Sequence, residues 1–196
     1  MNFLAHIYLS GKSEKLKIGN FIGDWVKGSR HKNYDAEIQK GILLHRKIDE
    51  FTDNHEIVKI SAKKFAPVYD RYSAVVCDIV YDHFLAINWK KYCNEELSDF
   101  SQNFYKLLQK NKEILPERVQ KFLPALIENK RLESYETLSG MEDVLYKMSI
   151  YTSLPEKSKQ GISIIKANYV SLNQEFNSFF PEIIKFVKNI DMSIEM

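Results

Sequence analysis

Three ionisable residues interrupt an otherwise apolar segment between Ala74 and Ile87. They are Asp78, Asp82 and His83, and every other residue of the segment is apolar or aromatic. A helix that is apolar nearly all round belongs in a protein interior, where an ionised carboxylate without a partner is very costly. On such a helix the two aspartates lie one turn apart, with the histidine beside them. Two carboxylates and an imidazole in one buried place suggest a metal ion.

A second segment, from Ala36 to Phe51, has one helical face that begins with apolar residues and ends with polar ones. Its members, spaced as one face of a helix, are Ile38, Ile42, His45 and Asp49. If the two isoleucines point into the core, His45 and Asp49 point the same way, and Arg46 lies at the edge of that face. The two polar segments could therefore meet through their ionisable groups.

Structural roles are the alternative for both segments. A buried His–Asp hydrogen bond in one segment and a salt-bridge network around Arg46 or Lys47 in the other would explain each segment by itself, since structural ion pairs are common. Two such groups at interior-facing positions in the same half of the chain favour a functional site instead.

Two further polar residues near the N-terminus join these candidates. His6 stands in an apolar opening segment and is expected to be buried, although a histidine there could be a satisfied core residue. Asp24, predicted on the same helix as Asn20, is flanked by Gly19 and Gly23, whose small size lets another helix or a ligand approach. The alternative for Asp24 is an exposed surface acid.

Together these residues indicate metal-dependent phosphoester chemistry. The set contains three imidazoles and four carboxylates: His6, Asp24, His45, Asp49, Asp78, Asp82 and His83. Mixed nitrogen and oxygen ligands suit Mn²⁺, Mg²⁺ or Fe²⁺ better than a thiolate site does, and such an ion stabilises charge on phosphoryl oxygens. The chain lacks the Glu-x-x-His motif of ferritin-like di-iron proteins, the His-Glu-x-x-His motif and the phosphate-binding Gly-x-x-x-x-Gly-Lys loop.

The composition is that of one globular helical domain. The chain has 196 residues, of which 44% are hydrophobic and 28% charged, with only seven glycines and five prolines. The formal net charge of +2 argues neither for nor against nucleic acid. The segment from Lys12 to Lys32, however, holds six basic and two acidic residues. It is either an ordinary solvated face or a docking surface for an acidic partner or a phosphate.

Helical periodicity predicts an all-α fold. Helices are expected near residues 2–10, 14–28, 35–51, 56–70, 73–91, 95–112, 117–130, 140–152, 157–178 and 180–190. The N-terminus has no basic leader, no apolar run is long enough to span a bilayer, and the two cysteines form no Cys-x-x-Cys pair. We therefore expect a soluble cytoplasmic protein.

Four sequence blocks resemble the bacterial acyl carrier protein phosphodiesterases. The blocks are MNFLAH (1–6), GNFIGDWVKG (19–28), GILLHRKIDEFTDNH (41–55) and DIVYDHFLA (78–86), in the expected order. The resemblance implies an atypical relative of the HD-type phosphohydrolases: a single HD-like helical bundle over residues 1–196, with about eight to ten helices. It implies hydrolysis of the phosphodiester between 4′-phosphopantetheine and a serine of holo acyl carrier protein, a step in lipid metabolism, with a divalent metal, most plausibly Mn²⁺.

The resemblance also implies residue roles. The metal ligands would be Asp24, His45, Asp49, Asp78 and Asp82, with His6 as a possible additional ligand. The catalytic residues would be His83, Asp82 and His6, with His83 relaying a proton to the departing serine oxygen. Substrate would be bound by Arg46, Asn20 and Lys27, with Arg46 gripping a phosphate oxygen through its forked guanidinium.

The predicted hydrolase and its two alternatives differ in the partner that they require. Acyl carrier proteins are acidic, so the basic segment from Lys12 to Lys32 would dock the substrate, and neither nucleic acid nor membrane is expected as a partner. An HD-like phosphohydrolase acting on a nucleotide or another small phosphoester would share the metal core without a protein docking surface. A non-enzymatic helical interaction module would keep the buried acids and histidines for structure alone.

Overall fold

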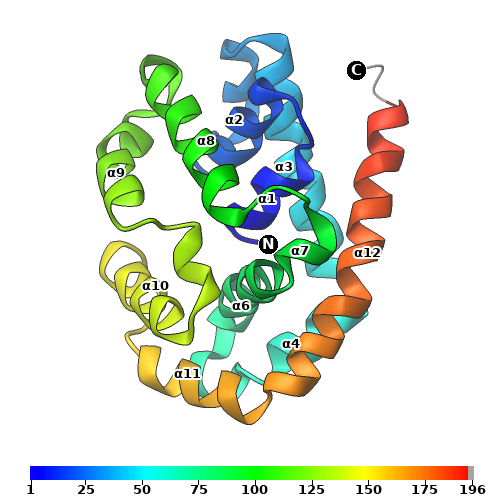
Figure 1. The fold of residues 1–196 in the computed structure, drawn as a ribbon, viewed down its shortest axis with the longest axis vertical. Helices are drawn as coiled ribbons and strands as arrows, with labels where there is room; N and C mark the ends of the chain where they lie inside the picture. Colours follow the sequence, from blue (N-terminus) through cyan, green and yellow to red (C-terminus); the bar gives the residue numbers. More distant parts are fainter. Residues whose placement is uncertain (194–196) are drawn as a thin grey trace. The chain divides into compact units, whose positions relative to one another are not determined.

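The computed structural model describes residues 1–193 and, within them, a chain built only of helices (Figure 1). It contains twelve α-helices and several short 3₁₀ turns over these residues, with no strand. The all-α prediction is therefore confirmed. The helices outnumber the predicted eight to ten partly because two of them, α5 (Ala66–Tyr69) and α7 (Trp89–Tyr92), are only four residues long.

Contacts along the chain group into two compact units. Unit 1 comprises residues 1–2, 48–87 and those from 134 onward, and unit 2 comprises residues 3–47 and 88–133. The long helix α3 (Ala36–Asn54) belongs to both units and is continuous from one to the other. The single domain over residues 1–196 stays a prediction.

Unit 2 carries the histidine-bearing helices. Besides the first part of α3 and α7, its α-helices are α1 (Phe3–Leu9), α2 (Glu14–Ile22), α8 (Leu97–Lys110) and α9 (Glu117–Glu128). Helix α1 packs against α2, and α8 packs against α9. Their apolar faces bury Leu4, Ile18, Phe21, Phe104 and Leu108, so the short α1 is held by packing rather than by its own hydrogen bonds.

Helices α2 and α3 cross at two glycines. A Cβ atom on Gly19 would lie 2.2 Å from the carbonyl oxygen of Ile38, and one on Gly41 would lie 2.5 Å from that of Leu16. Both glycines therefore allow the backbones to touch, as the small residues beside Asp24 suggested. The helix predicted over residues 14–28 ends earlier, at Ile22, and two 3₁₀ turns follow, η1 (Gly23–Trp25) and η2 (Gly28–Asn33).

Unit 1 is organised around the apolar helix α6 (Ser73–Ile87). Helix α4 (Glu56–Lys63) packs against both α6 and α12 (Tyr169–Ser193), and α10 (Leu138–Tyr151) packs against α6 and α11 (Ser158–Ala167). Two buried hydrogen bonds join these helices, because Ser61 contacts the Tyr81 hydroxyl at 2.7 Å and donates to Glu175 Oε2 at 2.5 Å.

Two predicted helix boundaries in the C-terminal part are wrong. The helix expected over residues 157–178 stops at Ala167, where Asn168 caps it by donating its side-chain amide to the carbonyl of Ile164. The break expected before Pro181 is absent, and α12 continues through this proline. Pro181 is exposed, so the carbonyl left without its helical N–H partner can reach solvent.

None of the described helices is both long and apolar enough to cross a bilayer.

Candidate active site

Helix α1 delivers His6 to a buried polar cluster. Its side chain is 2% exposed, and its Nδ1 lies 2.7 Å from Oδ1 of Asn20. The amide nitrogen of Asn20 donates to the His6 carbonyl at 2.8 Å and to Ser10 Oγ at 2.9 Å. The amide oxygen must therefore accept, so Nδ1 of His6 carries the proton. Nε2 of His6 is therefore the unprotonated ring nitrogen, as a metal ligand or a base requires.

Helix α3 delivers a second histidine in the same protonation state. His45 is 5% exposed, and its Nδ1 donates to the backbone carbonyl of Asn20 at 2.8 Å. A carbonyl can only accept, so Nε2 of His45 also holds an electron pair. The rings of His6 and His45 stack with centroids 4.1 Å apart. Asn20 thus fixes one histidine through its side chain and the other through its backbone.

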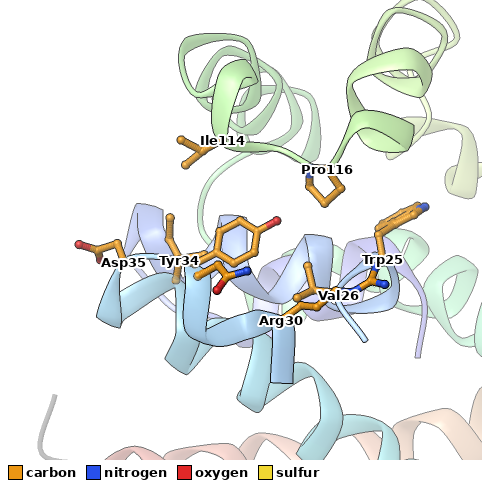
Figure 2. A pocket seen from close by; sticks show the side chains of 9 residues that line it. Trp25, Val26, Arg30, Tyr34, Asp35, Ile114 and Pro116 are labelled. Carbon is orange, nitrogen blue, oxygen red and sulfur yellow. The ribbon is translucent and has the colours of Figure 1, made fainter. Parts of the chain in front are cut away.

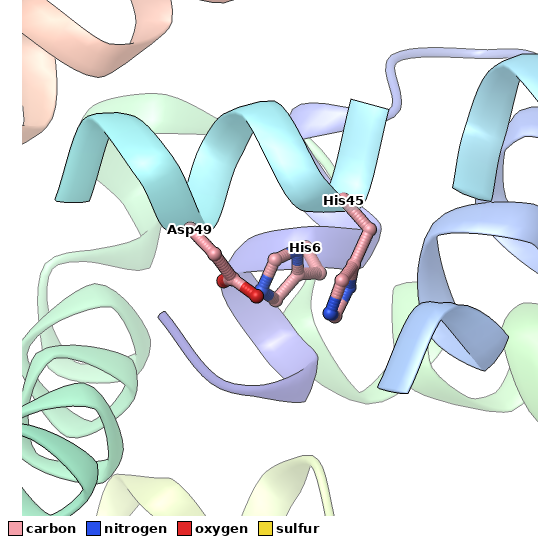
Figure 3. Close-up of side chains that lie close together, drawn as sticks. All are labelled: His6, His45 and Asp49. Atoms are coloured by element: carbon pink, nitrogen blue, oxygen red, sulfur yellow. The ribbon is translucent and has the colours of Figure 1, made fainter. Parts of the chain in front are cut away.

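His6, His45 and Asp49 form a group that could bind a metal ion (Figure 3). Asp49 follows His45 by one turn of α3, so helical geometry sets its place beside that residue. Each of the three residues offers a ligand atom, and these atoms all lie within 4.8 Å of one another. Metal-binding histidines usually donate their other ring N–H to a carbonyl or carboxylate. Both histidines meet this requirement, and a two-histidine, one-carboxylate set suits Mn²⁺ or Fe²⁺.

Asp24 and Lys27 lie near the His45 side of this group. One Asp24 oxygen is 3.6 Å from Nε2 of His45 and 4.0 Å from Nζ of Lys27. Its side chain is 59% exposed, and it lies on the turn η1 rather than on the predicted helix. Asp24 can therefore meet a ligand from solvent, whereas Asn20 is fully buried and its contacts are those of a residue that positions the histidines.

Arg46 supports the turn that carries Asp24. Its Nη2 donates to the carbonyl of Val26 at 3.0 Å and to that of Gly28 at 2.7 Å. Gly28 has a φ of +58°, a conformation that favours glycine. A guanidinium has five N–H donors, so these two bonds leave others for an anion. Binding of a phosphate by Arg46 stays a prediction.

The two aspartates of α6 have partners at the start of the chain, in unit 1. The amino group of Met1 lies 2.8 Å from Asp78 and 4.0 Å from Asp49, and the Asn2 N–H donates to Asp82 at 3.3 Å. Burial disfavours the Met1 charge, but the carboxylates of Asp78 and Asp49 outweigh it and raise its pKa to about 10. Burial raises the pKa of Asp78, and the amino group opposes this. Backbone nitrogens thus compensate these acids, whose metal-binding role stays a prediction.

Comparison with known proteins identifies the family. The sequence model of the family described as acyl carrier protein phosphodiesterase matches residues 1–183. This chain belongs to the acyl carrier protein phosphodiesterase family. Similar proteins of that name come from Yersinia pestis (31% identity; 94% of this chain and 96% of the relative) and Photorhabdus laumondii (29%; 97% of each). No solved structure matches, so the predicted HD-like relationship stays a prediction.

His83 is the predicted proton relay. Both of its ring nitrogens have a hydrogen-bond partner in unit 1. Nδ1 lies 2.6 Å from the carbonyl of Tyr135 and donates to it, and Nε2 lies 3.0 Å from the Tyr169 hydroxyl. Burial lowers the pKa of His83, although the bond to Tyr135 opposes this. A neutral His83 accepting from Tyr169 satisfies every polar atom of the ring. The relay stays a prediction, and its nearest hydroxyl is that of Tyr169.

Sequence reasoning missed two contributions to this acyl carrier protein phosphodiesterase site. It assigned Asn20 to substrate binding, and the structure places it between two histidines. It treated Gly23 as a small neighbour of Asp24, whereas a Cβ there would lie 2.3 Å from Cγ of His45. The absence of a side chain at residue 23 is therefore what allows the imidazole of His45 to lie where it does.

Proposed function

We propose that this chain hydrolyses the phosphodiester bond that joins 4′-phosphopantetheine to a serine of holo acyl carrier protein, releasing the apo protein. Family membership over residues 1–183 and the names of its relatives support this substrate. The observation that carries the chemistry is the pair of buried imidazoles, His6 and His45. Their Nδ1 protons are both engaged, and each residue offers a ring nitrogen within 4.8 Å of a carboxylate oxygen of Asp49.

The donor set supports a divalent metal, with Mn²⁺ as the expected ion and Mg²⁺ or Fe²⁺ as substitutes. We expect His6, His45 and Asp49 to hold it, and Asp24, Asp78 and Asp82 are the further predicted ligands. When bound, such an ion supplies positive charge that stabilises the phosphoryl oxygens and promotes attack by water.

The chain's own residues would orient the phosphodiester. Arg46 keeps donors beyond the two that hold the 26–28 turn, and they can bind a phosphoryl oxygen through charge-assisted hydrogen bonds. Asn20 keeps both imidazoles rigid, so no energy is spent on reorienting them when substrate binds. Asp24 is exposed beside His45, so its carboxylate can reach a bound ion from the solvent side.

The basic segment supports docking of an acidic carrier protein. Lys27, Arg30 and Lys32 are exposed, and Arg30 and Lys32 form no ion pair with any described residue. Free cations on one segment attract an acidic partner at long range and speed its encounter. The two free cysteines fit a reducing cytoplasm, where we place this reaction.

Mass spectrometry of holo acyl carrier protein tests this proposal. With Mn²⁺, the purified chain should remove the 4′-phosphopantetheine mass, and EDTA should prevent this. His45→Ala and Asp49→Asn should lower the rate by about 10²-fold or more. The matched control is Asp53→Asn, an exposed residue one turn beyond Asp49 on α3. This control should retain the wild-type rate.

Other outcomes identify the alternatives. If the carrier stays holo while a small phosphodiester or nucleotide is cleaved, the chain is a metal phosphohydrolase with another substrate. If neither is cleaved and no metal binds, a helical interaction module is the better account. Metal binding measured by calorimetry separates these two results from an inactive preparation.

Replacing three basic residues tests the docking surface. Lys27, Arg30 and Lys32 changed together to Glu should raise the KM for holo carrier protein at least ~10-fold, and should raise the KM for bis(4-nitrophenyl) phosphate much less. The matched control changes the exposed Lys159, Lys185 and Lys188 to Glu, with the same change in net charge. Equal effects of the two triple variants would contradict docking by the basic segment.

A further inference from the structure

A cavity of about 480 Å³ opens in unit 2 beside the turn that follows Asp24 (Figure 2). Its walls are mostly apolar and include Trp25, Tyr34, Ile114 and Pro116. Figure 2 shows Ile114 and Pro116 on one side and Tyr34 on the other. The volume falls within the range of about 300–1,000 Å³ that is typical of small-ligand sites.

Two residues that line the cavity directly follow a candidate site residue in the sequence. Trp25 and Val26, which both line the cavity, directly follow Asp24, whose carboxylate is 3.6 Å from Nε2 of His45. Arg46, the residue predicted to bind phosphate, also contacts the cavity lining, because its guanidinium donates to the Val26 carbonyl. A ligand that filled the cavity would therefore extend from the vicinity of the predicted phosphate site.

The polar groups of the lining suit a neutral chain of amides. The Trp25 indole N–H, the Tyr34 hydroxyl and the Asn33 amide all belong to lining residues, and none has a hydrogen-bond partner for its side chain within residues 1–193. Burial raises the pKa of Tyr34, so its hydroxyl stays a donor. Arg30 and Asp35 contribute one charge of each sign, and Asp35 is already paired with Lys15 at 3.2 Å.

Two other kinds of ligand fit less well. A second phosphate would need several cationic donors, and Arg30 is the one cationic residue among the described residues of the lining. A nucleobase is best held between two aromatic faces, but of the two aromatic lining residues only Tyr34 has a ring that no other described residue occupies. Trp25 is already stacked on Phe3, with centroids 5.9 Å apart, and tilted against Phe21 at 5.7 Å. The remaining option is a flexible, neutral ligand that alternates apolar groups with amides.

We propose that this cavity receives the pantetheine arm of the substrate, and this assignment rests on the proposed function. The gem-dimethyl and methylene groups of the arm lie against Trp25, Ile114 and Pro116. Its hydroxyl and amide oxygens accept from Tyr34 and Asn33. The cavity therefore selects for the prosthetic group itself, while the basic segment selects for the protein that carries it.

Binding of free pantetheine tests the assignment without relying on activity. Pantetheine has no phosphate, so it binds only if the arm itself is recognised. Saturation-transfer NMR should detect its methyl signals with the wild-type chain. Ile114→Trp fills the cavity from a position that is 42% exposed, and should abolish the transfer. The matched control is Ile60→Trp on α4, which is 52% exposed and outside the cavity.

A second variant and a kinetic measurement sharpen the test. Tyr34→Phe removes one donor with little change in volume, and should weaken pantetheine binding about 3- to 10-fold. Ile114→Trp should lower kcat/KM for holo carrier protein at least ~10-fold relative to the Ile60→Trp control.

The two proposals fail in different ways. If the wild type does not bind pantetheine, or if Ile114→Trp binds it as well as Ile60→Trp does, the cavity assignment is wrong even where the carrier is hydrolysed. If the wild type binds pantetheine and Ile114→Trp does not, but holo carrier is never cleaved, the cavity recognises the arm and the proposed reaction is wrong.

Discussion

Substituting Gly23 by alanine should disturb catalysis through a single imidazole. An ideal Cβ at this residue would lie 2.3 Å from Cγ of His45 and 2.6 Å from both its Cβ and Cδ2. Ordinary carbon–carbon contacts are about 3.5–4.0 Å. The ring of His45, or the turn that carries residue 23, must therefore shift by about 1 Å to accept one methyl group.

A shift of this size has two consequences of different magnitude. Overpacking by a methyl group costs about 1–3 kcal/mol of folding free energy, which a domain stable by about 5–15 kcal/mol tolerates. The same shift lengthens the 2.8 Å hydrogen bond between His45 and the Asn20 carbonyl. It also moves Nε2 well outside the tolerance of about 0.2 Å for a metal ligand. A 1 Å misplacement of a catalytic group costs about 10²-fold in rate.

The assay compares Gly23→Ala with Gly11→Ala. Gly11 has a φ of +64° and no neighbouring atom within 4 Å of an added Cβ, so its substitution costs about 1–2 kcal/mol through backbone strain alone. Both variants should unfold at lower urea concentrations than the wild type does. Only Gly23→Ala should lose about 10²-fold in kcat/KM for holo carrier protein, together with affinity for Mn²⁺. If folded Gly23→Ala is as active as Gly11→Ala, the role assigned to the His45 position is wrong.

Substitutions at three further residues test other contacts. Asn20→Ala removes the acceptor for His6 and should lower metal affinity and kcat/KM about 10- to 100-fold, whereas Asn20→Asp, which keeps an acceptor, should lose less in the same titration. Arg46→Lys keeps the charge but cannot hold the 26–28 turn and a phosphate together, so kcat/KM should fall at least ~10-fold while the thermal midpoint changes little. Burial raises the pKa of Tyr69 to about 12, so the folded chain keeps a proton that the unfolded chain loses near pH 10. Stability from this hydroxyl is present below pH 10 and lost as pH rises toward 12, and urea unfolding of Tyr69→Phe should show a weaker dependence on pH in that window.

Helical periodicity was sufficient to predict the face of α3 that carries the site. Ile38 and Ile42 are 3% and 0% exposed, and His45, on the same stripe, is 5% exposed. Asp49, which was expected to point into the core as well, has a side chain that is 39% exposed, so the prediction holds only as far as His45. The prediction worked because one buried face at a spacing of 3.6 residues fixes the direction of every side chain on it. The burial of His6 followed from the same reasoning, since a polar residue in a short apolar helix goes wherever its neighbours pack.

The partners of Asp78 and Asp82 could not be predicted in this way. Sequence reasoning correctly required compensation for two acids on an apolar helix, and it supplied a metal ion. In unit 1 the compensation comes from backbone nitrogens of Met1 and Asn2. Every residue has a backbone nitrogen, so these partners leave no mark in residue types or spacing. Whether a metal also binds there is a separate question, which Asp78→Asn and a Mn²⁺ titration would answer.

The protonation state of the two histidines depends on contacts that form only when helices pack. Gly19 and Gly41 let α2 and α3 touch, and this approach brings the Asn20 carbonyl within 2.8 Å of Nδ1 of His45. A larger residue at either glycine would separate the helices and leave that ring nitrogen without its acceptor. The position of the unprotonated nitrogen of His45, and hence the chemistry available to the site, therefore rests on two glycines that carry no functional group.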